Sequence, residues 1–140
     1  MNTRNDTKIL HKGLSYIIQG CFFDICKNYG PGQKESVYGN LLAEYLDKNK
    51  INFEREKQIV IYSKETSKKI GVYKPDFVAD NKIVIEIKAS RFTTKQDEKQ
   101  LYYYLRNSEY ELGYIVNFST PKLFIKRIVY SNYKKSFLKK

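Results

Sequence analysis

Residues 74–90, KPDFVADNKIVIEIKAS, contain an apolar run at 77–79 and a second at 83–88, with turn-forming residues between them. Successive side chains of a strand point to opposite faces, so Glu86 and Lys88 share one face of the second run and three isoleucines share the other. This β-branched, apolar composition predicts a central strand that is covered on both sides. Burying ions there costs on the order of several kcal/mol per ion, only partly recovered by pairing. Charges held at that cost indicate a chemical role.

A second acid precedes the turn. Antiparallel pairing about the turn predicts that Asp76 lies about level with Glu86, so that two carboxylates converge. Two such groups repel unless a cation lies between them. With two cysteines and one histidine the chain cannot assemble a Cys/His zinc site, and oxygen donors favour Mg²⁺ or Mn²⁺. Lys88, on the face of Glu86, reaches a water or phosphate oxygen beside the ion. The structural alternative is an Asp–Lys or Glu–Lys ion pair at a sheet edge.

Composition limits the choice of partner. The chain has 140 residues, with 26 Lys and Arg against 15 Asp and Glu, a net charge of +11. We expect one domain over 1–140, with 1–6 and 131–140 flexible or peripheral. The positive charge predicts a polyanionic partner, nucleic acid first and an anionic membrane surface second. The absence of a signal-peptide core and of a long apolar stretch predicts a cytoplasmic protein that does not span a membrane.

Hydrophobic periodicity predicts eight elements. They are helices at 7–28 and 33–49, strands at 52–62, 70–79 and 82–89, a helix at 95–106, and strands at 113–118 and 123–130. The order is therefore α-α-β-β-β-α-β-β. The first three strands form an antiparallel meander, and the helix at 95–106 crosses over to a strand parallel to the third one. The fold class is α/β (α+β), a mixed sheet with helices on its faces.

The helical patterns also predict buried faces. Ile17 falls on the apolar face of the first helix and Val37 on that of the second. Cys21 and Cys26 lie in the first pattern and are expected to be buried, reduced thiols. His11, the only histidine, is expected at the surface or in packing.

Two polar features remain unexplained by periodicity. Gln100 and Tyr104 are four residues apart and so share one face of the crossover helix, next to the carboxyl end of the preceding strand. The alternative is an ordinary amphipathic helix with a tyrosine cluster at 102–104. After Glu111 there is no further acidic residue, only basic ones interleaved with aromatics. These aromatics either stack on bases or complete the core, and a solvated basic tail is the alternative.

Three motifs together resemble a known family. Pro-Asp at 75–76 followed after nine residues by Glu-Ile-Lys at 86–88 resembles the signature of the PD-(D/E)XK nuclease superfamily. GQKESVY at 32–38 resembles the motif that names the GxxExxY family within it, and QLYYY at 100–104 resembles the QxxxY motif of related nuclease domains. The resemblance covers about 8–130 in the right order, and it implies a restriction-endonuclease-like fold.

The resemblance also implies roles for single residues. Asp76, Glu86 and the backbone carbonyl of Ile87 would bind the metal, with Glu35 completing the shell directly or through water. Lys88 would orient or deprotonate the attacking water and offset charge in the transition state. Gln100 and Tyr104 would hold the DNA backbone or the carboxylates of the site.

The sequence therefore predicts a Mg²⁺- or Mn²⁺-dependent deoxyribonuclease, with DNA favoured over RNA. Basic residues expected to bind the nucleic acid are Lys74, Arg91, Lys95, Lys99, Lys126 and Arg127. One alternative is a catalytically weak or inactive nucleic-acid-binding module on the same fold. Another is a protein-interaction partner that forms a homodimer through exposed tyrosines.

Overall fold

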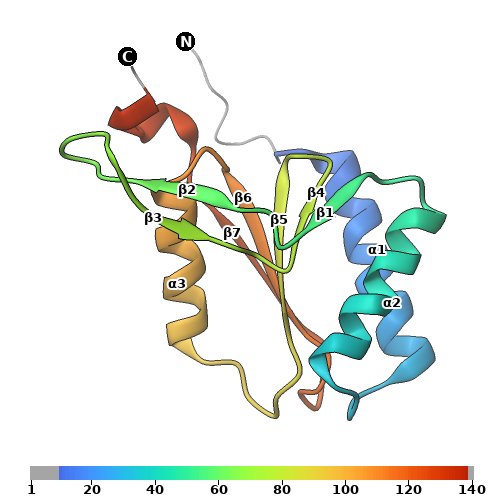
Figure 1. Cartoon of the computed structure of the whole chain (residues 1–140). Helices are drawn as coiled ribbons and strands as arrows, with labels where there is room; N and C mark the ends of the chain where they lie inside the picture. Colours follow the sequence, from blue (N-terminus) through green and yellow to red (C-terminus); the bar gives the residue numbers. More distant parts are fainter. Residues whose placement is uncertain (1–9, 139–140) are drawn as a thin grey trace.

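The computed structural model describes residues 10–138, which form three layers (Figure 1). Helices α1 (Lys12–Tyr29) and α2 (Glu35–Lys48) cover one face of a five-stranded sheet, and α3 (Lys95–Arg106) covers the other. The sheet order is β1-β4-β5-β6-β7, and β2 and β3 form a separate two-stranded sheet. The strands are β1 (Phe53–Arg55), β2 (Ile59–Tyr62), β3 (Lys69–Tyr73), β4 (Phe77–Ala79), β5 (Ile83–Lys88), β6 (Leu112–Asn117) and β7 (Phe124–Val129).

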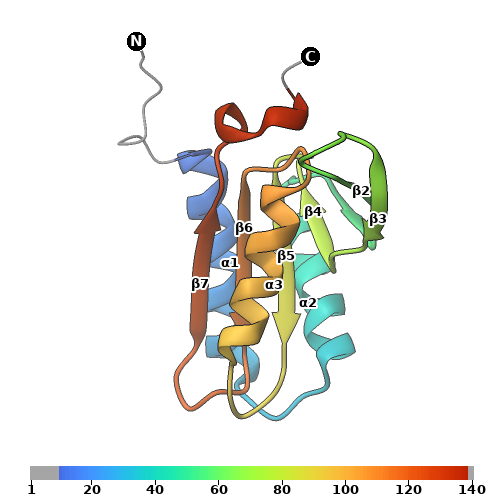
Figure 2. The same ribbon diagram turned by 90° about the vertical axis from the view of Figure 1, so that its left-hand side faces the viewer.

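The predicted crossover is confirmed. β5 and β6 are parallel and α3 connects them, whereas the other neighbouring strands of both sheets are antiparallel. Figure 2 shows α3 lying along the outside of these two strands. The helix spans the predicted residues because Thr94 accepts a hydrogen bond from the backbone of Asp97, whose side chain accepts one from the backbone of Thr94. The fold class is thus the predicted mixed sheet between helices.

Two predicted strands are each broken in two, which corrects the element order. The run at 52–62 forms β1 and β2, interrupted at Glu56, whose φ of 52° lies in the left-handed region. The run at 70–79 forms β3 and β4, interrupted before Pro75, which has no N–H to donate to a neighbouring strand. The breaks let β1 pair with β4 in the main sheet while β2 and β3 turn away together.

The central strand is buried on both sides, as predicted. Its isoleucines, Ile83, Ile85 and Ile87, pack in the core beneath α1 and α2. Val84 packs in the second core, beneath α3 and the small sheet. Glu86 and Lys88 continue the face of Val84, so both charged side chains lie on the α3 side of the sheet.

Two predicted core positions are wrong. Ile17 is 40% exposed and Val37 is 37% exposed. Each helix turns about 100° per residue, so a side chain one position from the buried stripe points away from the sheet. The stripe of α1 passes through Ile18, and that of α2 through Tyr38. No helix in the described part of the chain is both long and apolar enough to cross a membrane.

The two ends of the chain were predicted as flexible or peripheral segments, and only part of each is described. The first helix begins at Lys12. Its predicted start at Thr7 lies outside the described residues, as do residues 1–6 and 139–140. After β7, residues 131–138 include the short 3₁₀ helices η1 (Asn132–Lys134) and η2 (Ser136–Leu138). Phe137 stacks on Tyr62 with ring centroids 5.2 Å apart, which joins this segment to the small sheet. Cys21 is buried and Cys26 half-buried, both as free thiols.

Candidate active site

Asp76 and Glu86 lie side by side where β4 begins. The pairing of Phe77 with Ile85 sets Asp76 level with Glu86, as the turn predicted. The backbone N–H of Asp76 donates to Glu86 Oε1 at 3.3 Å, and the N–H of Ile87 donates to Asp76 Oδ2 at 2.7 Å. Each carboxylate is therefore held by a backbone group of the opposite strand. The sheet brings together the two acids that stand ten residues apart in sequence.

Tyr73 is a member of this site that the sequence did not reveal. Its hydroxyl donates to Glu86 Oε2 at 2.5 Å, and its ring stacks on Tyr104 with centroids 3.7 Å apart. Gln100 Nε2 in turn donates to the Tyr104 hydroxyl at 3.3 Å. The Gln100 and Tyr104 side chains thus reach the carboxylates through Tyr73. The only signal for Tyr73 was an aromatic residue shortly before Pro75, which is equally typical of a core strand.

Glu86 is the most perturbed acid of the site. Its pKa is raised from 4.5 to about 7, chiefly by burial and also by the charge of Asp76, although the hydrogen bonds from Tyr73 and from the Asp76 N–H act in the opposite direction. Burial and the neighbouring Glu86 also raise the pKa of Tyr73 well above its ordinary value, so the phenol stays protonated and donates. The two carboxyl groups of Asp76 and Glu86 thus lie together in a place where burial disfavours ionisation.

Lys88 points toward α3 on the face of Glu86. Its ammonium lies 3.7 Å from Asp97 Oδ1, and about a third of the lysine side chain is exposed. Asp97 is fixed at the same time by the N-terminal capping interaction with Thr94. The capping pattern was visible in the sequence, but nothing there indicated that Asp97 would also face the lysine.

Glu35, in the first turn of α2, lies near the carboxyl end of β5, where Lys88 and Ala89 are. Partial burial raises its pKa, and Asp76 raises it further, whereas Lys88 and the N–H of Ala89 lower it. Glu35, Asp76 and Ile87 line one pocket of about 320 Å³. The side chains of Glu86 and Lys88 do not line it, because they lie on the α3 side of the sheet. Glu35 and Asp76 therefore border the pocket on the α2 side, whereas the Glu86 side chain lies on the α3 side of β5.

Arg55 supplies a cation to that pocket, and the sequence analysis did not identify it. Its guanidinium stacks 5.0 Å from the centroid of Phe77, and it donates to Asn40 Oδ1 at 2.9 Å. A Cβ on Gly39 would lie 2.7 Å from Arg55 Nη2, so the glycine on α2 gives the arginine its space. The sequence carries no signal for this contact, because neither the strand pattern around Arg55 nor the helix pattern around Gly39 indicates that the two residues face each other.

The donors match a hard divalent cation by chemical type. Mg²⁺ is commonly held by one or two carboxylates together with waters and phosphate oxygens. The carboxylates of Asp76 and Glu86 fit this pattern, since burial and mutual repulsion leave their charge to be offset. Within residues 10–138 no group of three His, Cys, Asp or Glu side chains is arranged to hold a metal ion. In residue type the site therefore fits a two-carboxylate arrangement.

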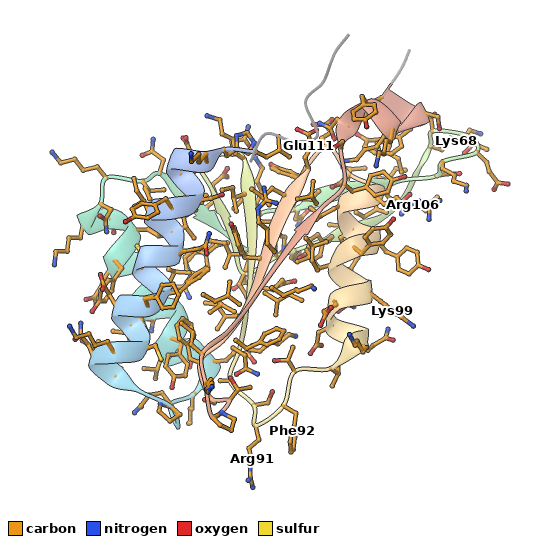
Figure 3. All side chains as sticks on the ribbon, turned by 180° about the vertical axis from the view of Figure 1, so that it is seen from behind. Lys68, Arg91, Phe92, Lys99, Arg106 and Glu111 are labelled. Carbon is orange, nitrogen blue, oxygen red and sulfur yellow. The ribbon has the colours of Figure 1, made fainter. Side chains whose placement is uncertain are left out.

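The six predicted nucleic-acid-binding residues do not form one surface. Arg91 lies at the tip of the loop between β5 and α3, and Lys99 on the outer side of α3 (Figure 3). Lys126 pairs across to Glu98 of α3 at 4.0 Å. Arg127 alternates to the other face of β7, where its charge lowers the pKa of His11. Lys95, the first residue of α3, and Lys74, between β3 and β4, are both exposed.

A larger pocket, of about 450 Å³, lies at the opposite end of β5, around Lys57 and Asn81. One of its lysines has partners: Lys57 donates to Asn81 Oδ1 at 2.9 Å and pairs with Glu54 at 3.2 Å. Figure 3 shows the separation, with Glu111, a lining residue, at one end of the molecule and Arg91 at the other. The two ends of β5 therefore differ less in pocket volume than in charge: Lys57 is paired with an acid at one end, whereas two carboxyl groups lie together at the other.

Comparison with known proteins identifies the family of the chain. A sequence model described as the PD-(D/E)XK nuclease superfamily matches residues 12–128. The three-layer arrangement with its mixed sheet is consistent with a restriction-endonuclease-like fold. No curated protein matches the chain. Members of the superfamily are typically phosphodiesterase nucleases and generally use divalent metal ions.

Proposed function

The chain belongs to the PD-(D/E)XK nuclease superfamily, and from this premise we propose that it is a Mg²⁺- or Mn²⁺-dependent deoxyribonuclease of the GxxExxY type. One observation carries the proposal. Glu86 accepts a hydrogen bond from the N–H of Asp76, the Asp76 carboxylate accepts one from the N–H of Ile87, and Lys88 lies on the strand face of Glu86. Paired carboxylates beside a lysine supply both the negative charge that a cation offsets and a group that can act on water.

Asp76 and Glu86 would hold the ion, together with the carbonyl of Ile87. The N–H and C=O of a strand residue face the same neighbouring strand, and the Ile87 N–H faces Asp76. Glu35 would complete the shell from α2, in keeping with the influence of Asp76 on its pKa. When bound, a divalent ion lowers the pKa of water and neutralises phosphate charge.

The remaining residues of the site orient these groups. Lys88 would position or deprotonate the attacking water and stabilise negative charge on the phosphate, and Asp97 restrains its ammonium. Tyr73 fixes the Glu86 carboxylate, and Tyr104 with Gln100 fixes Tyr73. Arg55, in the pocket beside Asp76, would bind a phosphate oxygen.

The net charge of +11 supports a nucleic-acid substrate. Of the six predicted basic residues, we assign Arg91, Lys95, Lys99 and Lys74 to the phosphate backbone. We also assign Lys126 to it, on the α3 side. Arg127 would contact the backbone from the other face of the sheet, because its charge acts on His11 beside α1.

The test is cleavage of plasmid and linear DNA with Mg²⁺ or Mn²⁺, with and without EDTA, and with RNA of the same sequence in parallel. We expect DNA cleavage that requires the cation and is lost in Asp76→Asn. Asp80→Asn is the matched control, since Asp80 is exposed and pairs with Lys82 at 3.5 Å. Cleavage that persists in EDTA, or equal cleavage by Asp76→Asn, would exclude the proposed site.

A second candidate function is nucleic-acid binding without turnover. It is favoured by the arrangement of Glu86, whose two oxygens already accept hydrogen bonds from Tyr73 and the backbone of Asp76. This candidate predicts salt-sensitive binding that is unaffected by EDTA and by Asp76→Asn. A collapse of binding under either condition would reject it.

A further inference from the structure

The loop at 90–94, between β5 and α3, presents an aromatic ring to solvent. Phe92 is 74% exposed, and its neighbour Arg91 is exposed as well. Figure 3 shows both side chains projecting at the end of the molecule, away from the helices and the sheet. A phenylalanine in this position buries little apolar surface, so it contributes little to the stability of the fold and its ring is available to a partner.

The loop is held in place by a buried side chain. Asn117, at the end of β6, is fully buried, and its Nδ2 donates to Thr93 Oγ1 at 3.0 Å and to Ser90 Oγ at 3.5 Å. Ser90 Oγ donates in turn to the carbonyl of Phe92 at 2.8 Å. The backbone on both sides of the aromatic residue is therefore fixed, and little conformational entropy remains to be lost when the ring binds something.

The loop also begins and ends at the candidate site. Lys88 precedes it and Asp97 follows it, and their charged groups lie 3.7 Å apart. Phe92 lies four positions after Lys88, so their Cα atoms are at most about 14 Å apart. That distance corresponds to roughly four steps along a nucleic-acid duplex. A nucleotide on Phe92 would be near the phosphate that Lys88 acts on.

We propose that Phe92 stacks on an unpaired base close to the reacting phosphate, while Arg91 contacts the adjoining backbone. This inference rests on the proposed function and names its substrate class: nucleic acid with an unpaired stretch, such as a gap, flap or single-stranded end. An intact duplex shows no free base face except at its ends, whereas every unpaired base offers one to an aromatic ring. The positive charge around the loop favours a polyanion over an apolar partner.

The chain contains no tryptophan, which makes a direct test possible. In Phe92→Trp the new residue is the only indole, and its fluorescence reports on its surroundings. We use EDTA to prevent cleavage, and titrate with a gapped oligonucleotide and a fully paired one of equal length, measuring binding in parallel by anisotropy. We expect quenching by the gapped oligonucleotide and much less by the paired one. Phe23→Trp, on α1 where Phe23 is 57% exposed, is the matched control and should not respond.

Phe92→Ala should weaken binding of the gapped oligonucleotide by about 5- to 100-fold and leave the paired one almost unchanged. Phe92→Tyr should restore it. Anisotropy that shows tight binding with no quenching of Phe92→Trp, or an unchanged preference in Phe92→Ala, would overturn this inference alone. Quenching without any cleavage would support it while rejecting nuclease activity. No binding of any oligonucleotide by the unaltered chain would reject both. A concentration-dependent blue shift without oligonucleotide would instead assign Phe92 to a contact between copies of the chain.

Discussion

Two clusters in this protein bury ionisable groups in opposite ways. The Glu86 cluster consists of Tyr73, Asp76, Glu86 and Lys88, and the Lys135 cluster of Ser108, Tyr110, Asn132 and Lys135. In both clusters burial is the largest cause of a pKa shift: the pKa of Glu86 is raised to about 7 and that of Lys135 is lowered to about 8. The difference lies in their neighbours.

Lys135 is fully surrounded by acceptors. Its ammonium donates to the carbonyls of Ser108 and Tyr110 and to Asn132 Oδ1 at 2.6–2.8 Å, and only 2% of the residue is exposed. The acids near it, Glu111 and Glu109, have the opposite charge. Glu86 instead lies beside Asp76, which has the same charge, and near a partly exposed lysine. Burial of an ionisable group is therefore not enough to indicate a functional site. Two half-buried groups of like charge, placed beside a partly exposed lysine, do indicate one.

The largest effect is expected at Lys88. Lys88→Ala should reduce DNA cleavage by about 10²- to 10⁴-fold, the usual contribution of a positioned acid–base group. Stability should change by less than about 1 kcal/mol, since the ion pair with Asp97 is partly solvated. Initial rates and urea unfolding measure the two effects.

Lys126→Ala is the control for Lys88→Ala. Lys126 also points to α3 and pairs with Glu98, the residue after Asp97, at 4.0 Å. It should keep cleavage within about tenfold, as expected for one phosphate contact. Equal losses in the two variants would show that the Glu86 cluster has no special role.

The next effect concerns pH and Glu86. The folded pKa of about 7 exceeds the ordinary 4.5, so between these values the folded state keeps a proton that the unfolded chain loses. The stabilisation is complete below pH 4.5 and is lost as the pH rises through 7. Glu86→Gln should abolish this loss. Above about pH 7 its free energy of unfolding should exceed that of the original chain by roughly 2–3 kcal/mol.

Urea unfolding across the same pH range, without divalent ions, checks the Glu86 prediction. Glu98→Gln serves as the control, because Glu98 pairs with a solvent-exposed lysine. A flat pH profile for the unaltered chain would mean that Glu86 is ionised without cost, and the comparison of the two clusters would fail.

Lys135 should give the opposite pH dependence. Its folded pKa of about 8 lies below the ordinary 10.5, so stability should rise with pH between these values as the unfolded chain retains the proton. Lys135→Met leaves three acceptors without their donor and should cost about 1–3 kcal/mol at neutral pH. Cleavage well below the unfolding temperature should be unchanged.

Thermal unfolding and cleavage rates of Lys135→Met, beside the exposed neighbour Lys134→Met, separate the two properties. A large loss of cleavage in a folded Lys135→Met would assign chemistry to the Lys135 cluster and remove the distinction.

The smallest effect is expected at Tyr73. Tyr73→Phe keeps the stacking on Tyr104 but removes the hydrogen bond to Glu86. It should cost about 1 kcal/mol of stability and reduce cleavage by no more than about tenfold. Because that hydrogen bond lowers the pKa of Glu86, the pH midpoint of the stability profile should move upward. Tyr62→Phe, which stacks on Phe137, should leave the midpoint in place.

Local pattern was enough for much of the fold. The helix at 95–106 was predicted to the residue from its periodicity, and the structure shows that a capping pair four positions long fixes where it begins. The parallel pairing of β5 and β6 followed from the helix that connects them, and Asp76 was set beside Glu86 by a short turn. Long-range packing decided the failures. Ile17 and Val37 were misplaced because adjacent apolar positions do not say which one faces the sheet.

The sequence by itself determined the central strand, its two charged residues and the acid across the turn, because alternation and a short connection act over a few residues. Only the tertiary structure decided what surrounds them. Tyr73, Arg55 and Asp97 come from three different elements, and they reach the site because the strands break at Glu56 and Pro75 and because α3 returns over the sheet. The relation between such residues is set by packing across the whole chain, which no local pattern encodes.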